Sequence, residues 1–414
     1  MTSSDSIHKL LDETVRRERG WLIASLVSKL GPSNVELAED VAQDAILKAL
    51  SIWPYKGVPD NPRAWLRRVA SNAAIDRVRR SARELGVDDD WDFITTEPDI
   101  ITPSLSDPEL DLMVLCCDPE LSQKDQLFLA LKTVCGFTAA ESAALFFMSE
   151  EALSQRLSRA RRQLKSRSGT LARFPTRFAL AERMPQVMKI IYLMFAQGYL
   201  PRRGDDLFRT DVCREALRLS EGLIASAQVK GASLNALHAL LLFQSSRQPA
   251  RTNAAGELIT LDQQDRALWD REAIAQAFKH LDAARADEVV TRYHLEAGIA
   301  SLHAQAVTWA ATDWASISRL YELLSQQAPS LAVFVNWAVS LLMLEDENGA
   351  RETLATAGSL RNAQSFPGYH LARARLAQHS GDTELQKRAL NAARACQTST
   401  AVDDHIDQEL SLIE

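Results

Sequence analysis

Cysteine is scarce in this sequence and irregularly placed. The five cysteines follow neither the spacing of a zinc site nor that of a disulfide framework: Cys116, Cys117, Cys135, Cys213 and Cys396. The adjacent pair is also poorly placed to form a disulfide with itself. We therefore expect no metal site and a reducing compartment.

Long apolar runs and targeting signals are also missing. No segment approaches the roughly 18 to 20 consecutive apolar residues that a membrane-crossing helix needs. The N-terminal stretch MTSSDSIHKLLDETVRRERG lacks the basic region and apolar core of a secretory signal. These absences predict a soluble, cytoplasmic protein.

Catalytic motifs are missing as well. We find no nucleophile motif, no phosphate-binding glycine loop and no H-E-x-x-H pattern. Asp205, Asp206 and Asp211 lie among arginines, and paired carboxylates can act as acid–base catalysts or metal ligands. Helix caps and surface ion pairs are the commoner explanation, so we predict no enzyme, no catalytic residue and no cofactor.

Glycine and proline are infrequent, with 16 and 14 in 414 residues, while Ala, Leu, Glu, Gln and Arg recur at spacings of three and four. This pattern predicts an all-α fold. Strand-like alternation is confined to short pieces such as ELITL at 257–261, from which we predict no sheet. A chain of this length, with 46% apolar residues, can bury two or three cores and so forms several domains.

Composition divides the chain into three helical regions and a linker. Residues 1–84 are amphipathic and end in a run of arginines. Residues 85–108 lose the helical period, gather aspartates and carry three prolines, as a linker does. A second unit covers residues 109–168, and a C-terminal extension covers residues 169–414.

The extension contains a loose repeat of about 34 residues, the period of tetratricopeptide arrays. Polar residues that can cap a helix recur at this interval, and so do alanines inside the expected helices: Asp313, Asn348 and Asp382, with Ala304, Ala338 and Ala372. Stacked helix pairs present a concave surface suited to a protein or peptide. An irregular helical bundle is the alternative.

The second unit has the spacing of a helix-turn-helix. Thr138 and Ser149 can each cap a helix, and the second helix has an apolar stripe that would pack on the first: Leu153, Leu157, Ala160 and Leu164. Its other side carries groups that could reach base edges and phosphates: Glu151, Gln155, Arg156, Arg159 and Arg162. An ordinary solvated helix would also carry arginines.

A second basic helix is expected over residues 61–84. Asn61 can cap it and Pro62 occupies the first helical position, where proline is favoured. Apolar residues form one face: Trp65, Leu66, Val69, Ala70 and Ala73. Polar and basic residues form the other, as DNA readout requires, although a solvated face would look similar: Arg68, Asn72, Asp76, Arg79 and Arg83.

Two stretches of the first region and one of the second resemble the extracytoplasmic-function (ECF) sigma factors of bacterial RNA polymerase. ELAEDVAQDAILKALSIWPYKG and NPRAWLRRVASNAAIDRVRR are similar to sigma region 2, and LSQKDQLFLALKTVCGFTAAESAALFFMSEEALSQRLSRARRQL to region 4. IIYLMFAQGYLPRRGDDLFRTDVCREALRL and RQPARTNAAGELITLDQQDRALWDR resemble the tetratricopeptide-like extension of one subgroup. The resemblance implies a region 2 bundle, a region 4 helix-turn-helix and a helical C-terminal domain.

The resemblance also implies partners for region 2. Asp40, Gln43 and Asp44 would contact the β′ clamp helices of core RNA polymerase from a helix whose other face is apolar through Val41, Ala45, Leu47 and Leu50. The loop 54–62 would correspond to the pocket for a flipped base, with Trp53, Tyr55 and Trp65 as candidate aromatics. The basic helix would read the single-stranded −10 element through Arg68, Asn72, Asp76, Arg79, Arg80 and Arg83.

Region 4 would bind the −35 duplex, with Gln155 near base edges and Arg156, Arg159 and Arg162 on phosphates, and the resemblance gives the polymerase β flap as its further partner. The linker would thread toward the RNA channel. A net charge of −7 then fits a protein that binds DNA as part of a holoenzyme. We expect the extension to fold against regions 2 and 4 and to tune their access to polymerase, and an anti-sigma or other regulatory protein is a partner that it could bind. The alternative is that the extension is required for activity and contacts polymerase itself.

Two other classes remain open from the sequence. A stand-alone helix-turn-helix regulator with a ligand- or protein-sensing helical domain would bind duplex DNA tightly without polymerase. A scaffold of helical repeats would not explain two basic helices in this order and spacing.

Overall fold

The computed structural model describes residues 18–31, 34–84, 105, 107–146, 148–166, 177–199, 209–226, 228–229, 231–253, 257–286, 289–396 and 400–413. Within these residues the regular structure is helical, apart from one isolated antiparallel bridge between Thr252 and Leu258. The predicted all-α fold is confirmed. None of the helices described here has both the length and the apolar content that crossing a bilayer demands.

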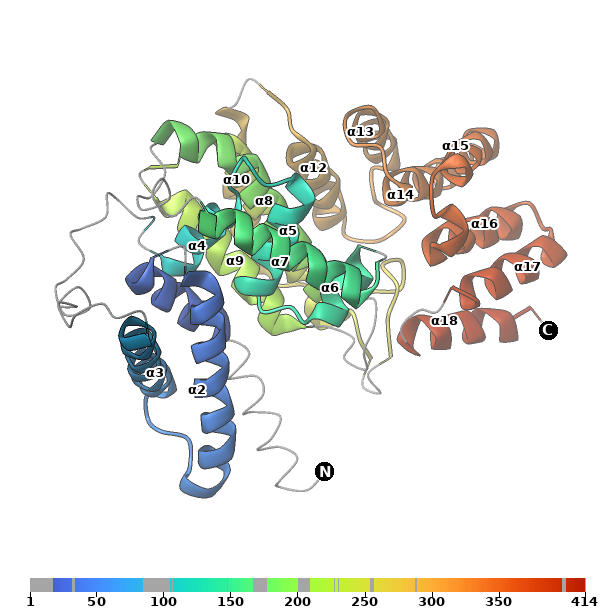
Figure 1. The fold of residues 1–414 in the computed structure, drawn as a ribbon. Coiled ribbons are helices and arrows are strands. Elements are labelled where there is room, and N and C mark those ends of the chain that lie inside the picture. Colours follow the sequence, from blue (N-terminus) through green and yellow to red (C-terminus); the bar gives the residue numbers. More distant parts are fainter. Residues whose placement is uncertain are drawn as a thin grey trace. The chain divides into compact units, whose positions relative to one another are not determined.

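The chain forms two compact units. The first comprises Met1–Phe195 and Thr210–Val229, and the second comprises Ala196–Arg209 and Lys230–Glu414. The first unit begins with a helical stretch over residues 18–30. Its further helices are α2 (Val35–Lys56), α3 (Pro62–Glu84), α4 (Pro108–Cys116), α5 (Gln123–Thr133), α6 (Ala139–Leu145), α7 (Glu150–Ser166), most of α8 (Arg177–Tyr199) and α9 (Thr210–Ala225) (Figure 1).

Helix starts in the first unit follow from short polar side chains, as expected. The Ala64 N–H donates to Asn61 Oδ1 at the start of α3. Thr138 and Glu141 form a reciprocal capping box at α6, and Ser149 Oγ accepts from the Ala152 N–H at α7. Each bond satisfies a backbone donor that the helix itself leaves without a partner.

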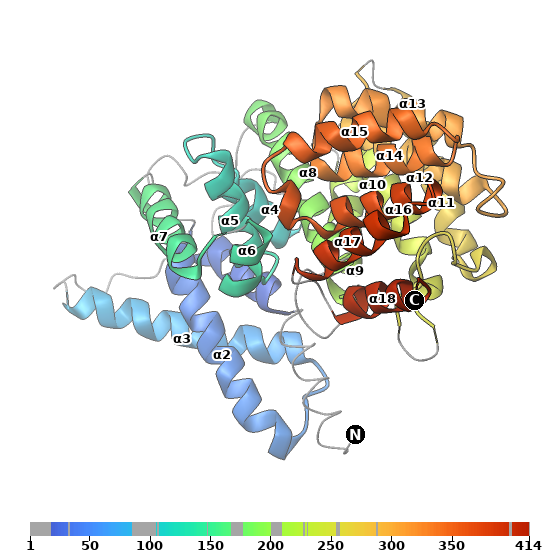
Figure 2. The same ribbon diagram turned by 90° about the vertical axis from the view of Figure 1, so that its right-hand side faces the viewer.

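Helices α2 and α3 pack across each other, as Figure 2 shows. The buried stripe of α3 consists of Leu66, Ala70 and Ala74; the predicted members Trp65, Val69 and Ala73 are half-buried. Small residues on α3 allow this close approach, and α2 supplies the larger side chains of the core: Val35, Val41, Ile46 and Trp53.

Helices α4–α7 enclose a second core in the same unit. The predicted stripe of α7, Leu153, Leu157, Ala160 and Leu164, is buried. Helix α7 packs on α5 and α6, and Phe128 of α5 meets Phe146 edge to face, with ring centroids 4.6 Å apart. Helices α6 and α7 thus pack on each other at the positions where the spacing predicts the two helices of a helix-turn-helix.

Helices α8 and α9 also belong to this first unit. Arg183 of α8 donates to the Val114 carbonyl of α4 over 2.9 Å, and α9 packs against α4. The grouping by contacts thus differs from the functional boundary that we expect after residue 168.

The second unit contains α10 (Ala232–Ser246), α11 (Arg271–Ala283), α12 (Arg292–Gln305), α13 (Trp314–Gln327), α14 (Leu331–Leu342), α15 (Glu347–Ser359), α16 (Pro367–His379), α17 (Thr383–Arg394) and α18 (Thr400–Ser411). Short 3₁₀ turns lie between them: η3 (Gln248–Ala250), η4 (Arg266–Leu268), η5 (Ala284–Ala286) and η6 (Ala363–Ser365). From α12 onward each helix packs on the next in the chain, as a stack of helix pairs does (Figure 1).

Two of the three predicted repeat caps are confirmed. Asp313 caps α13 and Asp382 caps α17. The third was misplaced by two residues: Asp346 caps α15 through the Gly349 N–H, so Asn348 lies inside the helix. The chain reverses just before, at Glu345, whose φ is 62°. The alanines expected in the helices are buried in α12, α14 and α16: Ala304, Ala338 and Ala372.

Candidate functional site

One side of α2 carries an exposed acidic cluster. Asp40, Gln43 and Asp44 are all exposed. Arg77 of α3 reaches both carboxylates, with Nη2 2.5 Å from Asp44 and Nη1 3.5 Å from Asp40. All three side chains keep at least two fifths of their surface exposed, so water screens these pairs and a partner can still approach them.

Leu47 corrects the sequence interpretation of α2. We expected it on the buried face with Val41 and Ala45, but it is 56% exposed while those two are fully buried. At about 100° per residue, Leu47 lies roughly 200° around the helix from Ala45. It therefore lies beside Gln43 and Asp44, one turn further along, as an apolar side chain in a polar surface. We call Asp40, Gln43, Asp44 and Leu47 the α2 face.

The polar side of α3 is exposed as expected. One helix face presents Arg68, Asn72, Asp76 and Arg79, and Arg80 lies next to it. Arg83 lies in the last turn of α3, and its side chain is outside the described residues. The helix thus presents arginines to solvent with one amide and one carboxylate among them.

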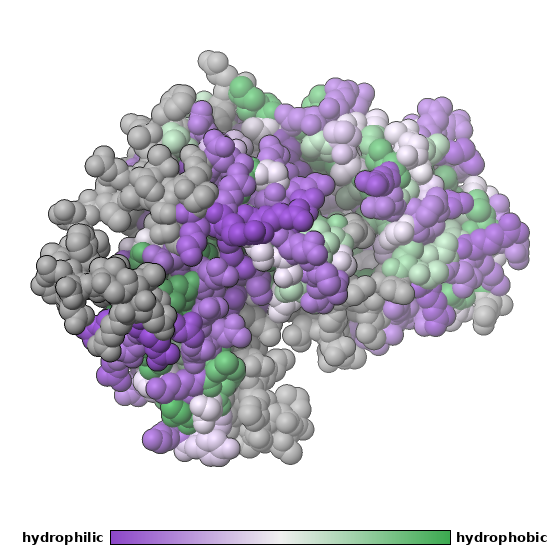
Figure 3. Space-filling model, viewed as in Figure 1, coloured by the Kyte–Doolittle hydropathy of each residue, from purple (hydrophilic) through white to green (hydrophobic). Residues whose placement is uncertain are grey.

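The connection between α2 and α3 exposes an aromatic and an aliphatic side chain. Tyr55 is 89% exposed and Val58 is 42% exposed, and Figure 3 shows apolar patches on the surface near this end of α2. Gly57 ends the helix with φ 83°, a conformation that costs glycine little. Of the other candidate aromatics, Trp53 is buried and meets half-buried Trp65 at 5.4 Å between ring centroids, so both belong to the core.

Helix α7 carries the second basic face. Glu151, Gln155, Arg159 and Arg162 are exposed, and Figure 3 shows a predominantly hydrophilic surface over this helix. Hydrogen bonds from its own backbone N–H and from Ser149 hold the pKa of the Glu151 carboxyl below its usual value. That carboxylate is therefore engaged at the start of the helix.

Two arginines of α7 contact neighbouring helices of the same unit. Arg156 Nη1 lies 3.2 Å from Asp125 of α5. This arginine, which we predicted to contact a DNA phosphate, is therefore paired with a carboxylate of its own unit. Arg161 Nη2 lies 2.5 Å from Glu39 of α2, and both side chains are largely buried. Glu39 also accepts from the Thr133 hydroxyl over 2.7 Å.

The Glu39–Arg161 pair joins two regions that composition separates in the sequence, residues 1–84 and residues 109–168. Nearby, Arg19 donates to the Lys132 carbonyl over 3.1 Å, and a Cβ on Gly20 would collide with the Val134 carbonyl oxygen. The helical stretch at residues 18–30 therefore lies against the end of α5, and the Glu39 side chain links α2 to α5 and α7. No sequence signal predicts an ion pair across 122 residues.

Several predicted features lie outside the described residues. These are Asp205 and Asp206 of the carboxylate cluster, and the linker from residue 85 to 104 with residue 106. In the parts of the chain that the structure does cover, no three His, Cys, Asp or Glu residues come together as ligands for a metal ion.

Comparison with known proteins assigns the first region. The family model described as Sigma-70 region 2 matches residues 14–84, which contain the α2 face and α3. A second model, described as a family of unknown function (DUF6596), matches residues 183–285. No solved structure matches the chain.

A curated protein of Rhizobium meliloti (strain 1021), named Uncharacterized protein R00370, is 33% identical over 411 residues, which cover 93% of this chain and 91% of that protein. The likeness thus extends through both units. The chain belongs to one family with this protein, and the Sigma-70 region 2 match over residues 14–84 supports a sigma-70 family RNA polymerase sigma factor, a class that binds core polymerase and promoter DNA to begin transcription.

Proposed function

We propose that this protein is an ECF sigma factor that directs core RNA polymerase to its promoters, reading the single-stranded −10 element with α3 and the −35 duplex with α7. One observation carries the proposal. The exposed cationic face of α3 lies next to the acidic and apolar α2 face within one packed helix pair. Promoter strand and polymerase can thus be bound by a single rigid support.

The α2 face has the composition of a protein-docking site. Such sites combine an apolar anchor with a surrounding polar rim. Here Leu47 is the anchor, and Asp40, Gln43 and Asp44 are the rim, which would meet basic groups on the β′ clamp helices. Arg77 holds two of these carboxylates on the side toward α3. The two side chains therefore have less conformational entropy to lose when a partner docks.

Replacing the anchor tests this docking site. We expect Leu47→Asp to weaken binding to core polymerase at least about tenfold, since losing a central interface anchor costs roughly 2 kcal/mol or more and ~1.4 kcal/mol corresponds to tenfold. The side chain is exposed, so the free energy of unfolding should change by less than about 0.5 kcal/mol. Fluorescence anisotropy of labelled protein against core enzyme measures the affinity. Leu323→Asp, at a 51% exposed leucine of α13, is the matched control, and equal affinities of both variants would contradict the docking site.

The face of α3 suits a separated strand. Arginines on one helix face can follow a phosphate backbone, and Asn72 can donate to and accept from a base edge. Tyr55, almost fully exposed at the α2–α3 connection, can stack on an unpaired base, which contributes ~1–3 kcal/mol per base. Stacking of this size is comparable with the cost of unstacking one base.

Helix α7 suits a duplex. Gln155, Arg159 and Arg162 are exposed along one face, where they would reach base edges and phosphates from the major groove. Arg156 shares its charge with Asp125, so we assign it a smaller part in this contact than its position in the sequence suggests.

The extension would tune this activity. In the first unit, α7 is held to α2 by the Glu39–Arg161 pair, and α8 and α9 pack on α4. Both basic helices are thus tied to neighbours within the unit before polymerase binds. The helix pairs from α12 to α18 support a tetratricopeptide-like array, whose surface would take an anti-sigma or other regulatory protein.

Run-off transcription with purified core polymerase tests the proposal. We expect a specific transcript that depends on the added chain, from promoters selected by sequencing the transcripts made by the reconstituted enzyme. Tight duplex binding by the isolated protein, without any polymerase-dependent transcript, would support a stand-alone regulator instead.

A truncation that tests the role of the extension should end after Val229 and not near residue 170, because the earlier cut removes α8 and α9 from the first unit.

A further inference from the structure

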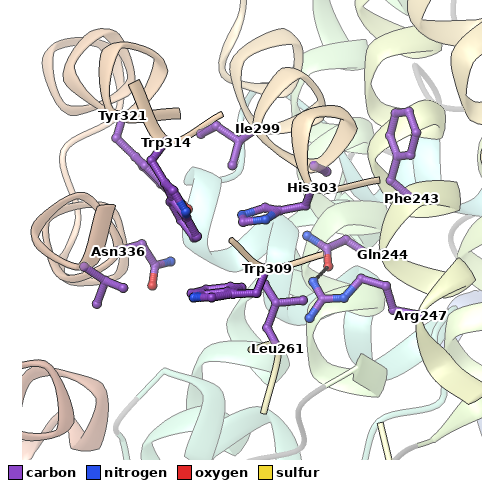
Figure 4. A pocket seen from close by; sticks show the side chains of 12 residues that line it. Phe243, Gln244, Arg247, Leu261, Ile299, His303, Trp309, Trp314, Tyr321 and Asn336 are labelled. Carbon is purple, nitrogen blue, oxygen red and sulfur yellow. Dashed lines mark hydrogen bonds between the residues drawn. The ribbon is translucent and has the colours of Figure 1, made fainter. Parts of the chain in front are cut away.

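The second unit contains a pocket of about 210 Å³ (Figure 4). This volume greatly exceeds the roughly 10–15 Å³ that one water needs, and it is below the roughly 300–1,000 Å³ of pockets for drug-sized ligands. Helices α10, α12, α13 and α14 line it, together with the segment before α13. The space suits a small metabolite.

Aromatic rings form much of the wall. The rings of His303 and Trp309 are nearly parallel, at 13°, with centroids 6.1 Å apart. Trp314 meets Trp309 edge to face at 4.5 Å. Figure 4 shows these rings gathered on one side of the space, with Arg247 and Gln244 facing them. A flat molecule could stack on the indole surface here.

Two polar atoms in this wall lack a partner. Trp314 Nε1 and His303 Nδ1 are buried polar atoms without a hydrogen-bond partner, on side chains of residues that are 8% and 9% exposed. Native structures seldom leave such atoms unsatisfied, and each one calls for an explanation such as a missing ligand, ion or water. A ligand with acceptor oxygens would satisfy the indole N–H.

The pocket is electropositive. Arg247 donates to the amide oxygens of Gln244 over 3.2 Å and of Gln264 over 3.4 Å. Arg266 donates to the His303 carbonyl over 2.6 Å and to the Thr312 hydroxyl over 3.2 Å. Among the residues that the structure describes, neither guanidinium has a carboxylate within ion-pair distance.

Neighbouring ionisable groups agree with this sign of charge. Burial, together with the charges of Arg247 and Arg266, lowers the pKa of His303 to about 3, so its imidazole is neutral near pH 7. The nearby acids are paired elsewhere: Glu296 with Arg292 at 2.6 Å and Asp262 with Arg375 at 3.1 Å. Of the two arginines only Arg247 lines the pocket, so its charge is left for a ligand to neutralise.

An aromatic cage can also bind a cation, but here guanidinium groups already lie against the rings. Arg375 lies 5.8 Å from the centre of the Trp309 ring. A second cation would be repelled by this group and by Arg247.

We propose that the pocket binds a small planar organic carboxylate, with Arg247 on the carboxylate, Trp314 Nε1 donating to an oxygen and the Trp309 ring stacked on the planar part. A guanidinium matches a carboxylate in shape as well as charge. This site is separate in chemistry from promoter recognition, and it makes the protein a receptor for a small anion.

Titration of the full chain with benzoate tests the site, with benzamide as a neutral molecule of similar shape and benzyltrimethylammonium as a cation. We expect saturable one-site benzoate binding by calorimetry with quenching of tryptophan fluorescence, and at least tenfold weaker binding of benzamide. Arg247→Met should weaken benzoate at least tenfold and leave benzamide nearly unchanged. Arg388→Met, at an exposed arginine of α17, should change neither.

A second variant keeps the test decisive if Arg247→Met unfolds. Trp309→Ala retains both arginines and should weaken benzoate and benzamide alike, because it removes the stacking surface. The proposal is overturned if benzoate shows no saturable binding, if benzamide or the cation binds as tightly, or if folded Arg247→Met retains the wild-type affinity.

Discussion

The double variant Arg79→Glu/Arg159→Glu is expected to lose promoter-directed transcription by at least about 100-fold in a run-off assay. Each arginine is exposed, one on α3 and one on α7, where we propose contacts to the two promoter elements. A charge-assisted hydrogen bond to phosphate contributes roughly 1.5–3 kcal/mol, and reversal adds repulsion from the backbone. Two such losses on separate elements should be nearly additive.

The control separates DNA contact from damage to the fold. Arg388→Glu changes an exposed arginine of the second unit by the same charge and should leave the transcript yield unchanged. The double variant should still bind core polymerase, because neither substitution touches the α2 face. The affinity of its holoenzyme for promoter DNA should also depend less on salt than that of the wild-type holoenzyme, since fewer counterions are released from the DNA. Wild-type transcript levels from the double variant would remove α3 and α7 as the reading helices.

Features set by local chemistry could be predicted from the sequence. Asn61, Thr138 and Ser149 cap helices as expected, because a cap depends on side chains within three residues. The apolar stripe of α7 is buried as predicted, since its helical period is visible in the sequence alone. Leu47 shows the limit of this reasoning. Grouping it with nearby apolar residues ignored its angle around the helix, and the structure exposes it.

Features that join distant residues could not be predicted. Glu39 and Arg161 are 122 positions apart, and nothing in either local pattern indicates the other. The pocket likewise draws Arg247 from α10's end, His303 from α12 and Asn336 from α14. In the sequence each of these looks like an ordinary polar residue of a helix. They can form a binding site only because the fold brings them together in a place with little water, where polar interactions are stronger.

The last prediction concerns Arg218 of α9, which lies within the segment matched by the family of unknown function. Its guanidinium contacts Asp107, Glu109 Oε2 at 2.5 Å and Glu215 Oε1 at 2.5 Å. We expect Arg218→Met to lower the free energy of unfolding of the first unit by about 2–4 kcal/mol, somewhat less than the ~3–5 kcal/mol of a fully buried pair because this arginine is partly exposed. Urea denaturation at pH 8 measures the loss.

The pH dependence identifies the cause. Burial and the neighbouring Glu215 raise the pKa of Glu109 to about 8, against the opposing charge of Arg218. A group whose pKa is raised in the folded state contributes stability that is present at low pH and lost as the pH rises through that value. The loss in Arg218→Met should therefore shrink between pH 8 and pH 5.5, and Glu109→Gln in the same chain should restore much of it at pH 8. A loss that is independent of pH, or no rescue, would mean that Arg218 acts through packing or through Asp107 and Glu215, and not through Glu109. With the predicted dependence, α9 supplies the charge that Glu109 needs, and a sigma factor cut before α9 would carry an uncompensated acidic cluster at the start of α4.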